Sequence, residues 1–242
     1  MSGRHKSWVT ADTINAHLDR YCIKEALVTD LHARVVHPRE DGNSRMMAAI
    51  KDNDRLHPVW VIEPPKQPGQ GAVEELVGAI LEAGVKAVRF PMSHIPPMEW
   101  LWKDLCSKLA EHHVPCFLDF GKDSTWGDLK DTDIDGIRDI ARAHPELPLV
   151  ISHVMGGLGV HPGMLYLLRR VDNLYLDILG ILEYWREFAA DCGPQRVLFA
   201  SGAPFTDTGI LISNIQYMVG FTDEERKLMY GNNLRRLLAG VR

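Results

Sequence analysis

The chain has 242 residues, of which 45% are hydrophobic and 24% are charged, and its formal net charge is −5. This length suits one (β/α) barrel of roughly 250 residues, so we expect a single domain over residues 1–242. The sequence contains no Lys/Arg-rich run that would attract nucleic acid and no apolar stretch of the roughly 18 residues that a membrane span requires. We therefore expect neither nucleic acid nor a membrane as a partner.

The cysteines and the N-terminus bear on where the protein works. The four cysteines lack CxxC spacing, and the N-terminal stretch MSGRHKSWVTAD lacks the apolar core of a signal peptide. Scattered cysteines in a chain of this size are typical of reduced thiols, not of a disulfide framework or a zinc knuckle. We expect a cytoplasmic protein.

Short runs rich in Val, Ile, Leu and Phe recur along the chain, with helical segments between them. Continuous apolar runs, as opposed to alternating patterns, are typical of parallel strands that are buried on both faces. The predicted strands span residues 25–30, 57–64, 85–91, 114–120, 148–154, 174–180 and 196–202.

Helices are predicted before the first strand, at 10–22, and between or after the strands at 72–84, 98–113 and 222–238. Their apolar residues recur with a period of 3.6, and the last segment opens with Thr222 and Glu225 at capping-box spacing. Alternating strands and helices predict an α/β fold with a parallel sheet, here a TIM-type (β/α) barrel. Because only the short, barely apolar segment MSGRHKSWV precedes the first helix, the first of the eight strands is expected to be missing or divergent.

The active site of a (β/α) barrel lies at the carboxyl ends of its strands. Several polar residues stand at those ends inside otherwise apolar runs, where they are costly unless paired or coordinated. The candidate site residues are Glu63, Arg89, His94, Asp119, His153, Asp177 and Ser201.

His153 interrupts an apolar strand just before a Gly-Gly pair, which suits a metal ligand or a general base. The alternative is a buried His that is satisfied by a neighbouring carbonyl. Asp119 and Asp177 could ligate a cation, exchange a proton or pair with Arg89. The fork of Arg89 suits a substrate carboxylate, and a simple salt bridge is the alternative. No GxSxG, P-loop, GxGxxG or HExxH motif is present.

Four stretches carry a resemblance to a known family. They are GVKAVRFP (84–91), HPELPLVISHVMGG (144–157), NLYLDILG (173–180) and QRVLFASGAPF (195–205). With these stretches the chain resembles, from about Thr10 to its end, the amidohydrolase-related family, which includes aminocarboxymuconate-semialdehyde decarboxylase and related hydrolases and decarboxylases. The resemblance implies a metal-dependent TIM-type barrel.

The family's metal is held by a His-x-His on strand one, His residues on strands five and six, and an Asp on strand eight. By this resemblance His153 matches the strand-six His and Asp119 stands at the strand-five position. Gly202 replaces the strand-eight Asp, and the His-x-His has no counterpart. The resemblance thus implies either a rebuilt site for a divalent metal, zinc or manganese, on His153, Asp119 and a third ligand, or no cofactor.

Two hypotheses for the function remain open. The first is a hydrolase of C–N or C–O bonds, or a carboxy-lyase, acting on a small carboxylated or cyclic substrate. His153, Asp119 and Asp177 would then manage protons. The substrate would be bound by Arg89, Glu63, His94 and Ser201. The second hypothesis is a non-catalytic barrel that binds a ligand or supports a partner. A missing strand would leave sheet edges that favour a homo-oligomer.

Overall fold

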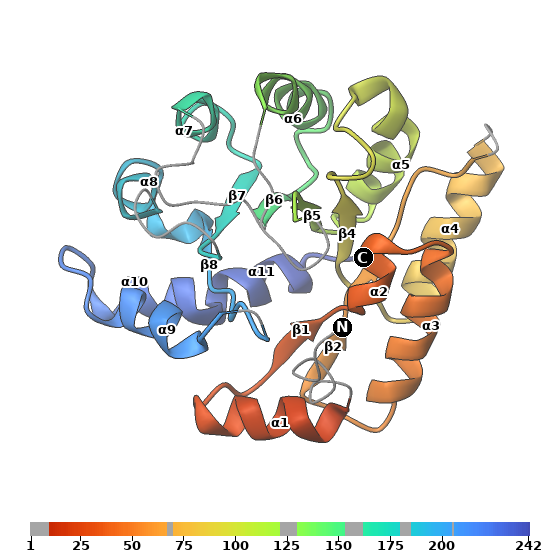
Figure 1. Ribbon diagram of the computed structural model, residues 1–242. Coiled ribbons are helices and arrows are strands. Elements are labelled where there is room, and N and C mark those ends of the chain that lie inside the picture. The colour runs from red at the N-terminus through yellow and green to blue at the C-terminus, as the bar shows by residue number, and fades with distance from the viewer. Residues whose placement is uncertain (1–9, 67–69, 122–129, 153–161, 180–184, 205) are drawn as a thin grey trace.

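Parallel strands and helices alternate along the chain, and the helices surround the strands (Figure 1). The computed structural model describes residues 10–66, 70–121, 130–152, 162–179, 185–204 and 206–242. The strands are β1 (Ala26–Val28), β2 (Leu56–Pro58), β3 (Trp60–Val61), β4 (Val88–Pro91), β5 (Cys116–Asp119), β6 (Leu149–Ser152), β7 (Leu174–Asp177) and β8 (Val197–Leu198). The predicted α/β class is confirmed.

The strands pair in parallel and in chain order. β3 to β8 form one six-stranded sheet, and β1 pairs with β2. Only Val59 separates β2 from β3, and its N–H donates to the carbonyl of Val28 at 2.8 Å. The run predicted as one strand at 57–64 therefore pairs with β1 through its first half and with β4 through its second. Each of the seven predicted strands overlaps a strand of the structure, and the segment MSGRHKSWV lies outside the described residues.

Each of the four helical segments predicted from periodicity overlaps at least one helix of the structure, and further helices lie outside these segments. They are α1 (Ala11–Arg20), α2 (Leu31–Val35), α3 (Arg39–Ile50), α4 (Gln70–Glu82), α5 (Glu99–Glu111), α6 (Asp131–Ala143), α7 (Pro162–Leu168), α8 (Trp185–Cys192), α9 (Thr208–Gln216), α10 (Asp223–Lys227) and α11 (Asn233–Ala239). The short elements η3 (Pro194–Arg196) and η4 (Leu228–Asn232) complete the set. The helix predicted over 222–238 is interrupted at η4, a π-helical turn, because Gly231 leaves the helical region with φ 175° and ψ −24°. Within the described ranges, no helix is both long enough and apolar enough to cross a membrane.

β5, β6 and β8 are buried at every position, as their continuous apolar runs predict, whereas β1 is only half-buried. On the outer face, residues such as Phe90, Leu118 and Ile151 pack among the surrounding helices in the largest apolar cluster. Alternate residues point to the inner face, where Phe117 and Val150 belong to a smaller cluster. The remaining buried members of this inner cluster are Val59, Ala87, Leu198 and, from α11, Leu237. Helix α11 therefore contributes an apolar side chain to the space that the strands enclose.

The strand register places polar residues at one level above this inner cluster. Asp119 pairs with Pro91 on one side and with Ser152 on the other. Because Ile151 pairs with Leu176, Ser152 and Asp177 follow at the next position of β6 and β7. Each of these polar residues stands two positions beyond an inward residue of its own strand, so it lies on the same inner face. The carboxyl ends of the strands thus converge on a polar layer.

Gly136 tests how tightly the helical layer packs. A Cβ atom at this position of α6 would lie inside the contact distance of the Pro97 carbonyl oxygen, which belongs to backbone that cannot easily move. We expect Gly136→Ala to lower the free energy of unfolding by about 1–3 kcal/mol or more, measured by urea denaturation. The control is Gly78→Ala in α4, where a Cβ meets no described atom within 4 Å. It should be neutral or stabilising by up to about 1 kcal/mol. Equal stability of the two variants would contradict this packing.

Candidate functional site

Among the described residues, the most buried ion pair joins the N-terminal part of the chain to the end of β5. Arg34 of α2 donates from Nε to Oδ2 of Asp119 at 2.6 Å and from Nη2 to Oδ1 at 3.0 Å. The two side chains are only 4% and 3% exposed. Helix α2 begins directly after β1 because Asp30 caps it, accepting the Ala33 N–H at 3.0 Å. This cap sets the position from which Arg34 reaches Asp119.

A second guanidinium reaches the same carboxylate. Arg89 of β4 donates from Nη1 to Oδ2 of Asp119 at 3.2 Å and to Oγ of Ser152 at 3.4 Å. Its guanidinium carbon also lies 5.4 Å from the centre of the Phe117 ring, a cation–π arrangement. Burial lowers the pKa of Arg89 while the neighbouring carboxylates of Asp119 and Asp177 raise it, and a guanidinium remains charged under such conditions.

Ser152 connects Arg89 to Asp177. The hydroxyl of Ser152 donates to Oδ2 of Asp177 at 2.5 Å, and the Leu179 N–H donates to Oδ1 at 3.0 Å. Burial raises the pKa of Asp177 to about 7, against the opposing effects of the Ser152 hydrogen bond and the charge of Arg89. At neutral pH this carboxyl group therefore exists in both protonation states, which is the condition for proton transfer in either direction.

We call Arg34, Asp119, Arg89, Ser152 and Asp177 the strand-end network. Within it, Asp119 accepts four N–H groups: two from Arg34, one from Arg89 and one from the Gly121 backbone at 2.9 Å. An ionised carboxylate offers about four lone-pair positions, and the four described donors engage both of its oxygens. Asp119 is a carboxylate that fixes two guanidinium groups.

Glu63, predicted to bind substrate, holds a third arginine. Arg39, the first residue of α3, donates from Nε to Oε2 of Glu63 at 2.9 Å. Its Nη1 donates to the carbonyls of Ala33 at 2.6 Å and of Arg34 at 3.1 Å. Arg39 is therefore fully engaged in fastening α2 and α3 to the end of the β2–β3 run. Glu63 is an anchor for this arginine in the described structure.

The remaining predicted residues are not brought into the strand-end network by the described contacts. His94 is exposed in the turn after β4, where its backbone N–H donates to the Pro91 carbonyl at 3.0 Å. Ser201 follows β8, and its carbonyl accepts the Thr208 hydroxyl at 2.9 Å. That hydroxyl also contacts Nε2 of His17 at 2.8 Å, so Ser201 belongs to a polar contact between α1 and α9. His153 lies outside the described residues.

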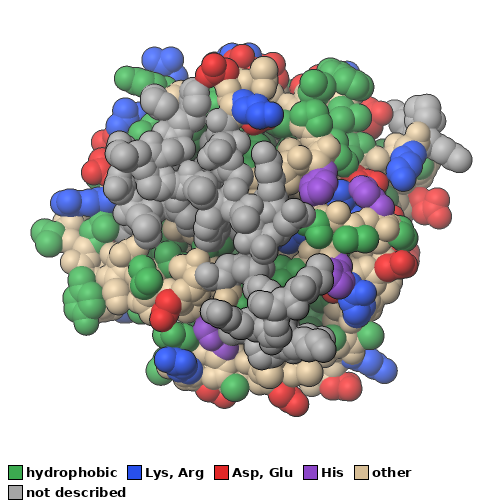
Figure 2. Space-filling model, viewed as in Figure 1, with side chains coloured by type: hydrophobic (Ala, Val, Ile, Leu, Met, Phe, Trp, Pro, Cys, Tyr) green, Lys and Arg blue, Asp and Glu red, His purple; other side chains and the backbone are tan. Residues whose placement is uncertain are grey.

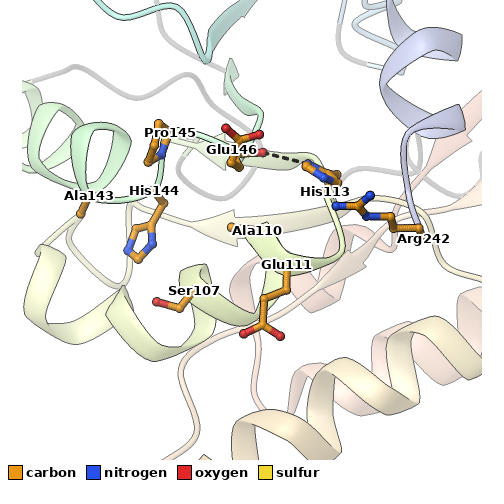
Figure 3. A pocket seen from close by; sticks show the side chains of 9 residues that line it. All are labelled: Ser107, Ala110, Glu111, His113, Ala143, His144, Pro145, Glu146 and Arg242. Atoms are coloured by element: carbon orange, nitrogen blue, oxygen red, sulfur yellow. Dashed lines mark hydrogen bonds between the residues drawn. The ribbon is translucent and has the colours of Figure 1, made fainter.

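A groove of about 500 Å³ lies at the opposite end of the strands, near their amino ends (Figure 3). It is lined by the C-terminal ends of α5 and α6, which precede the amino ends of β5 and β6. The ring of His113 contacts the Glu146 carbonyl there at 3.3 Å.

On the face drawn in Figure 2, His side chains lie beside Lys or Arg side chains over α2 and its neighbouring loops. Because barrel chemistry takes place at strand carboxyl ends, the strand-end network is the stronger candidate.

Comparison with known proteins identifies the family. Residues 18–239 match the sequence model of a family described as amidohydrolase. The chain belongs to the amidohydrolase family. No curated protein matches the chain in sequence. The resemblance seen in the four sequence stretches is thus confirmed.

Solved structures of amidohydrolase type share the fold. An uncharacterised TIM-barrel protein from Bordetella bronchiseptica superimposes with a TM-score of 0.74 at 17% identity, over 96% of this chain and 83% of that one. The 5-carboxyvanillate decarboxylase of Sphingomonas paucimobilis gives 0.69 at 12% identity, over 93% and 82%. The 2,6-dihydroxybenzoate decarboxylase of Rhizobium gives 0.63 at 13% identity, over 95% and 88%. At these identities the similarity establishes the TIM-barrel type of fold, and the described strands form an open series.

The family often uses divalent metals, which need several His, Cys, Asp or Glu ligands gathered at one place. No group of three His, Cys, Asp or Glu side chains among the described residues is placed to hold an ion. Asp119 directs both oxygens at arginine donors, whose positive charges oppose a cation. Gly202, at the strand-eight position, has φ +66°, and a Cβ there would lie 2.7 Å from both Leu179 Cδ1 and Thr206 Cβ. The described residues do not fit a metal centre at Asp119.

Sequence reasoning missed Arg34, Arg39 and Ser152. Arg34 and Arg39 lie in a segment, 31–50, for which no helix was predicted, although it follows directly after a predicted strand. Their position just beyond that strand end is the signal that could have included them among the candidates. Ser152 stands next to His153 in the same predicted strand end, and a serine at such a place is a weaker chemical signal than a histidine.

The buried charges of the network predict a large effect of one neutral substitution. Asp119→Asn leaves Arg34 and Arg89 without their shared counter-charge, and we expect a loss of about 3–5 kcal/mol in the free energy of unfolding. Asp135→Asn is the control, because Asp135 forms an exposed pair with Arg138. It should change stability by less than about 1 kcal/mol in the same urea titration. Similar small effects for both variants would show that the buried pairs contribute no more than surface ones.

The raised pKa of Asp177 predicts a stability that depends on pH. Between its ordinary value of 3.8 and about 7, the folded protein keeps a proton that the unfolded chain releases, so stability falls as pH rises through this window. Asp177→Asn removes this titration. Between pH 5 and pH 8, the wild type should lose roughly 2–3 kcal/mol more unfolding free energy than the variant. Parallel pH curves from urea denaturation would contradict the raised pKa.

Proposed function

We propose that this amidohydrolase-family protein is an enzyme, a hydrolase or decarboxylase-like lyase, that acts on a small carboxylated substrate at the strand-end network. The observation that carries the proposal is the hydrogen-bonded series Arg89–Ser152–Asp177, which joins an anion-binding group to a carboxyl group with a pKa of about 7. Asp177 is the last residue of β7, and Arg89, the second residue of β4, contacts Asp119 and Ser152 at the carboxyl ends of β5 and β6, where this type of fold places its chemistry.

Arg89 is the proposed binding group for the acid of the substrate. Its side chain is 11% exposed, compared with 3% for Asp119. The planar fork of a guanidinium matches a carboxylate in two parallel hydrogen bonds, and such charged bonds are stronger than neutral ones. The contacts with Asp119 and Phe117 restrict the orientation of Arg89 before any substrate arrives.

Asp177 is the proposed proton-transfer group. In a decarboxylation, the bond to the carboxyl carbon breaks, carbon dioxide leaves, and the electron pair left on carbon takes the proton from protonated Asp177. In a hydrolysis, ionised Asp177 takes a proton from the water that attacks the substrate carbon, the C–N or C–O bond breaks, and Asp177 returns the proton to the leaving nitrogen or oxygen. A group whose pKa lies near the working pH serves either step. Ser152 keeps one oxygen of Asp177 in place through its hydrogen bond.

The comparisons support an enzymatic role. The structural neighbours include proteins named as decarboxylases and one named as 4-oxalomesaconate hydratase. No observation on the described residues favours the alternative of a non-catalytic barrel, since the charged strand-end residues form a connected buried network. The candidate substrates are therefore small aromatic or cyclic carboxylates.

A panel of such carboxylates, assayed for carbon dioxide release and for hydrolysis, tests the proposal. With an active substrate, Arg89→Met should lower kcat/KM by roughly 10- to 100-fold, mainly through KM, because it removes a charged hydrogen bond. Asp177→Asn should lower kcat by about 100-fold or more. Asp191→Asn is the control, because Asp191 forms an exposed pair with Arg169 on another part of the surface.

The pH profile separates the two reactions. A decarboxylase that uses protonated Asp177 loses activity as pH rises above about 7, whereas a hydrolase that uses its carboxylate loses activity as pH falls below about 7. Either inflection should disappear in Asp177→Asn. Turnover that is unchanged by both Arg89→Met and Asp177→Asn would refute the assignment of this site.

A further inference from the structure

Two buried guanidinium groups share one carboxylate at the end of β5. Arg34 and Arg89 each carry a full positive charge, and Asp119 carries one negative charge between them. In a place with so little solvent, two guanidinium groups gathered at one carboxylate offer charged N–H donors that an anion can accept.

The position of this positive charge is the position where the resemblance predicts a metal ion. The two metal-ligand positions that the described residues include are Asp119 and Gly202. The first is occupied by arginine donors on both oxygens, and the second has a positive φ with no room for a Cβ atom. At each of these two positions the chain lacks an available ligand for a cation, so both changes weaken metal binding at the strand ends.

We propose that Arg34 and Arg89, held on Asp119, form an oxyanion-binding centre that takes the place of the family's metal ion. A metal would attract and polarise a substrate oxygen through its positive charge. Here two guanidinium groups supply positive charge and N–H donors at the corresponding strand ends. The ligand class is an oxyanion, and a carboxylate is the form that the proposed reaction supplies.

The centre is held rigid from three sides, which favours binding without rearrangement. The Gly121 N–H fixes the Asp119 carboxylate, and the Phe117 ring lies beside Arg89. The carbonyl of Arg34 accepts a hydrogen bond from buried Arg39 at 3.1 Å, so the backbone that carries Arg34 is fastened as well. Arg34 therefore contributes its positive charge from a fixed position, with Nε and Nη2 both bonded to Asp119.

The identity of the oxyanion as a substrate group rests on the proposed function, whereas the binding of an anion in preference to a metal does not. Metal content and anion affinity therefore test this inference without any turnover. The experiment uses tag-free full-length protein with benzoate as the anion probe, benzamide as its neutral match, and zinc or manganese chloride as the cation probes.

We expect less than one tenth of an equivalent of zinc or manganese by elemental analysis after incubation with excess metal and desalting. Benzoate should raise the Tm and bind in calorimetry at least about 10-fold more tightly than benzamide. Its affinity should fall about 10-fold or more in Arg89→Met, and should fall in Arg34→Met and recover in part in Arg34→Lys. Arg138→Met, which breaks exposed pairs with Asp135 and Asp139 on α6, should bind benzoate as the wild type does.

Near-stoichiometric metal in the wild type that is lost in Asp119→Asn would overturn the inference. So would benzoate affinity that is equal in the wild type and Arg89→Met, once circular dichroism shows that the variant is folded. If the Met variants fail to fold, the comparison of benzoate with benzamide on the wild type and the affinity of Arg34→Lys decide the question. Benzoate binding without turnover of any carboxylate would refute the proposed function and leave this inference standing.

Discussion

The structure depends on the pairing of Arg34 with Asp119. This contact joins residues 85 positions apart, and both side chains are almost completely buried. Removing two charges from water is unfavourable unless their geometry is close and their other hydrogen bonds are made. Here the bond is bidentate, and Asp119 gains further donors from Arg89 and Gly121. The N-terminal α2 is thereby fixed to the centre of the sheet, where it contributes to the site instead of merely covering it.

The strands make this pairing feasible because their inner face changes character along its length. At the level of Phe117 and Val150 the inner face is apolar except for Arg89, which pairs with Phe117 in the register, and two residues later, at Asp119 and Ser152, it is polar. An alternating side-chain direction and a regular register are sufficient to produce these two levels. The apolar level, which α11 joins through Leu237, separates the buried charges from the amino ends of the strands.

The sequence predicts the strands well and the site only in part. Continuous apolar runs locate every described strand. Charged residues inside such runs, such as Arg89, Asp119 and Asp177, need a polar partner, and the sequence identifies them as candidates for that reason. Arg34 was not predicted because α2 has only five residues, too few to show a helical period. The choice between metal ligand and salt-bridge partner for Asp119 also depends on which distant arginine reaches it, and no local pattern carries that information.

Asp119 and Asp177 show how one residue type acquires two roles at matching positions of the sheet. Asp119 faces two guanidinium groups, which favour its charged form and commit both of its oxygens. Asp177 accepts its hydrogen bonds from a hydroxyl and a backbone N–H, and burial raises its pKa to about 7. Environments that differ in this way assign the fixed charge to one carboxyl group and the exchangeable proton to the other. Because Ser152 lies between Arg89 and Asp177, an anion bound at Arg89 would lie next to that proton, which is the arrangement that acid–base chemistry on a carboxylate requires.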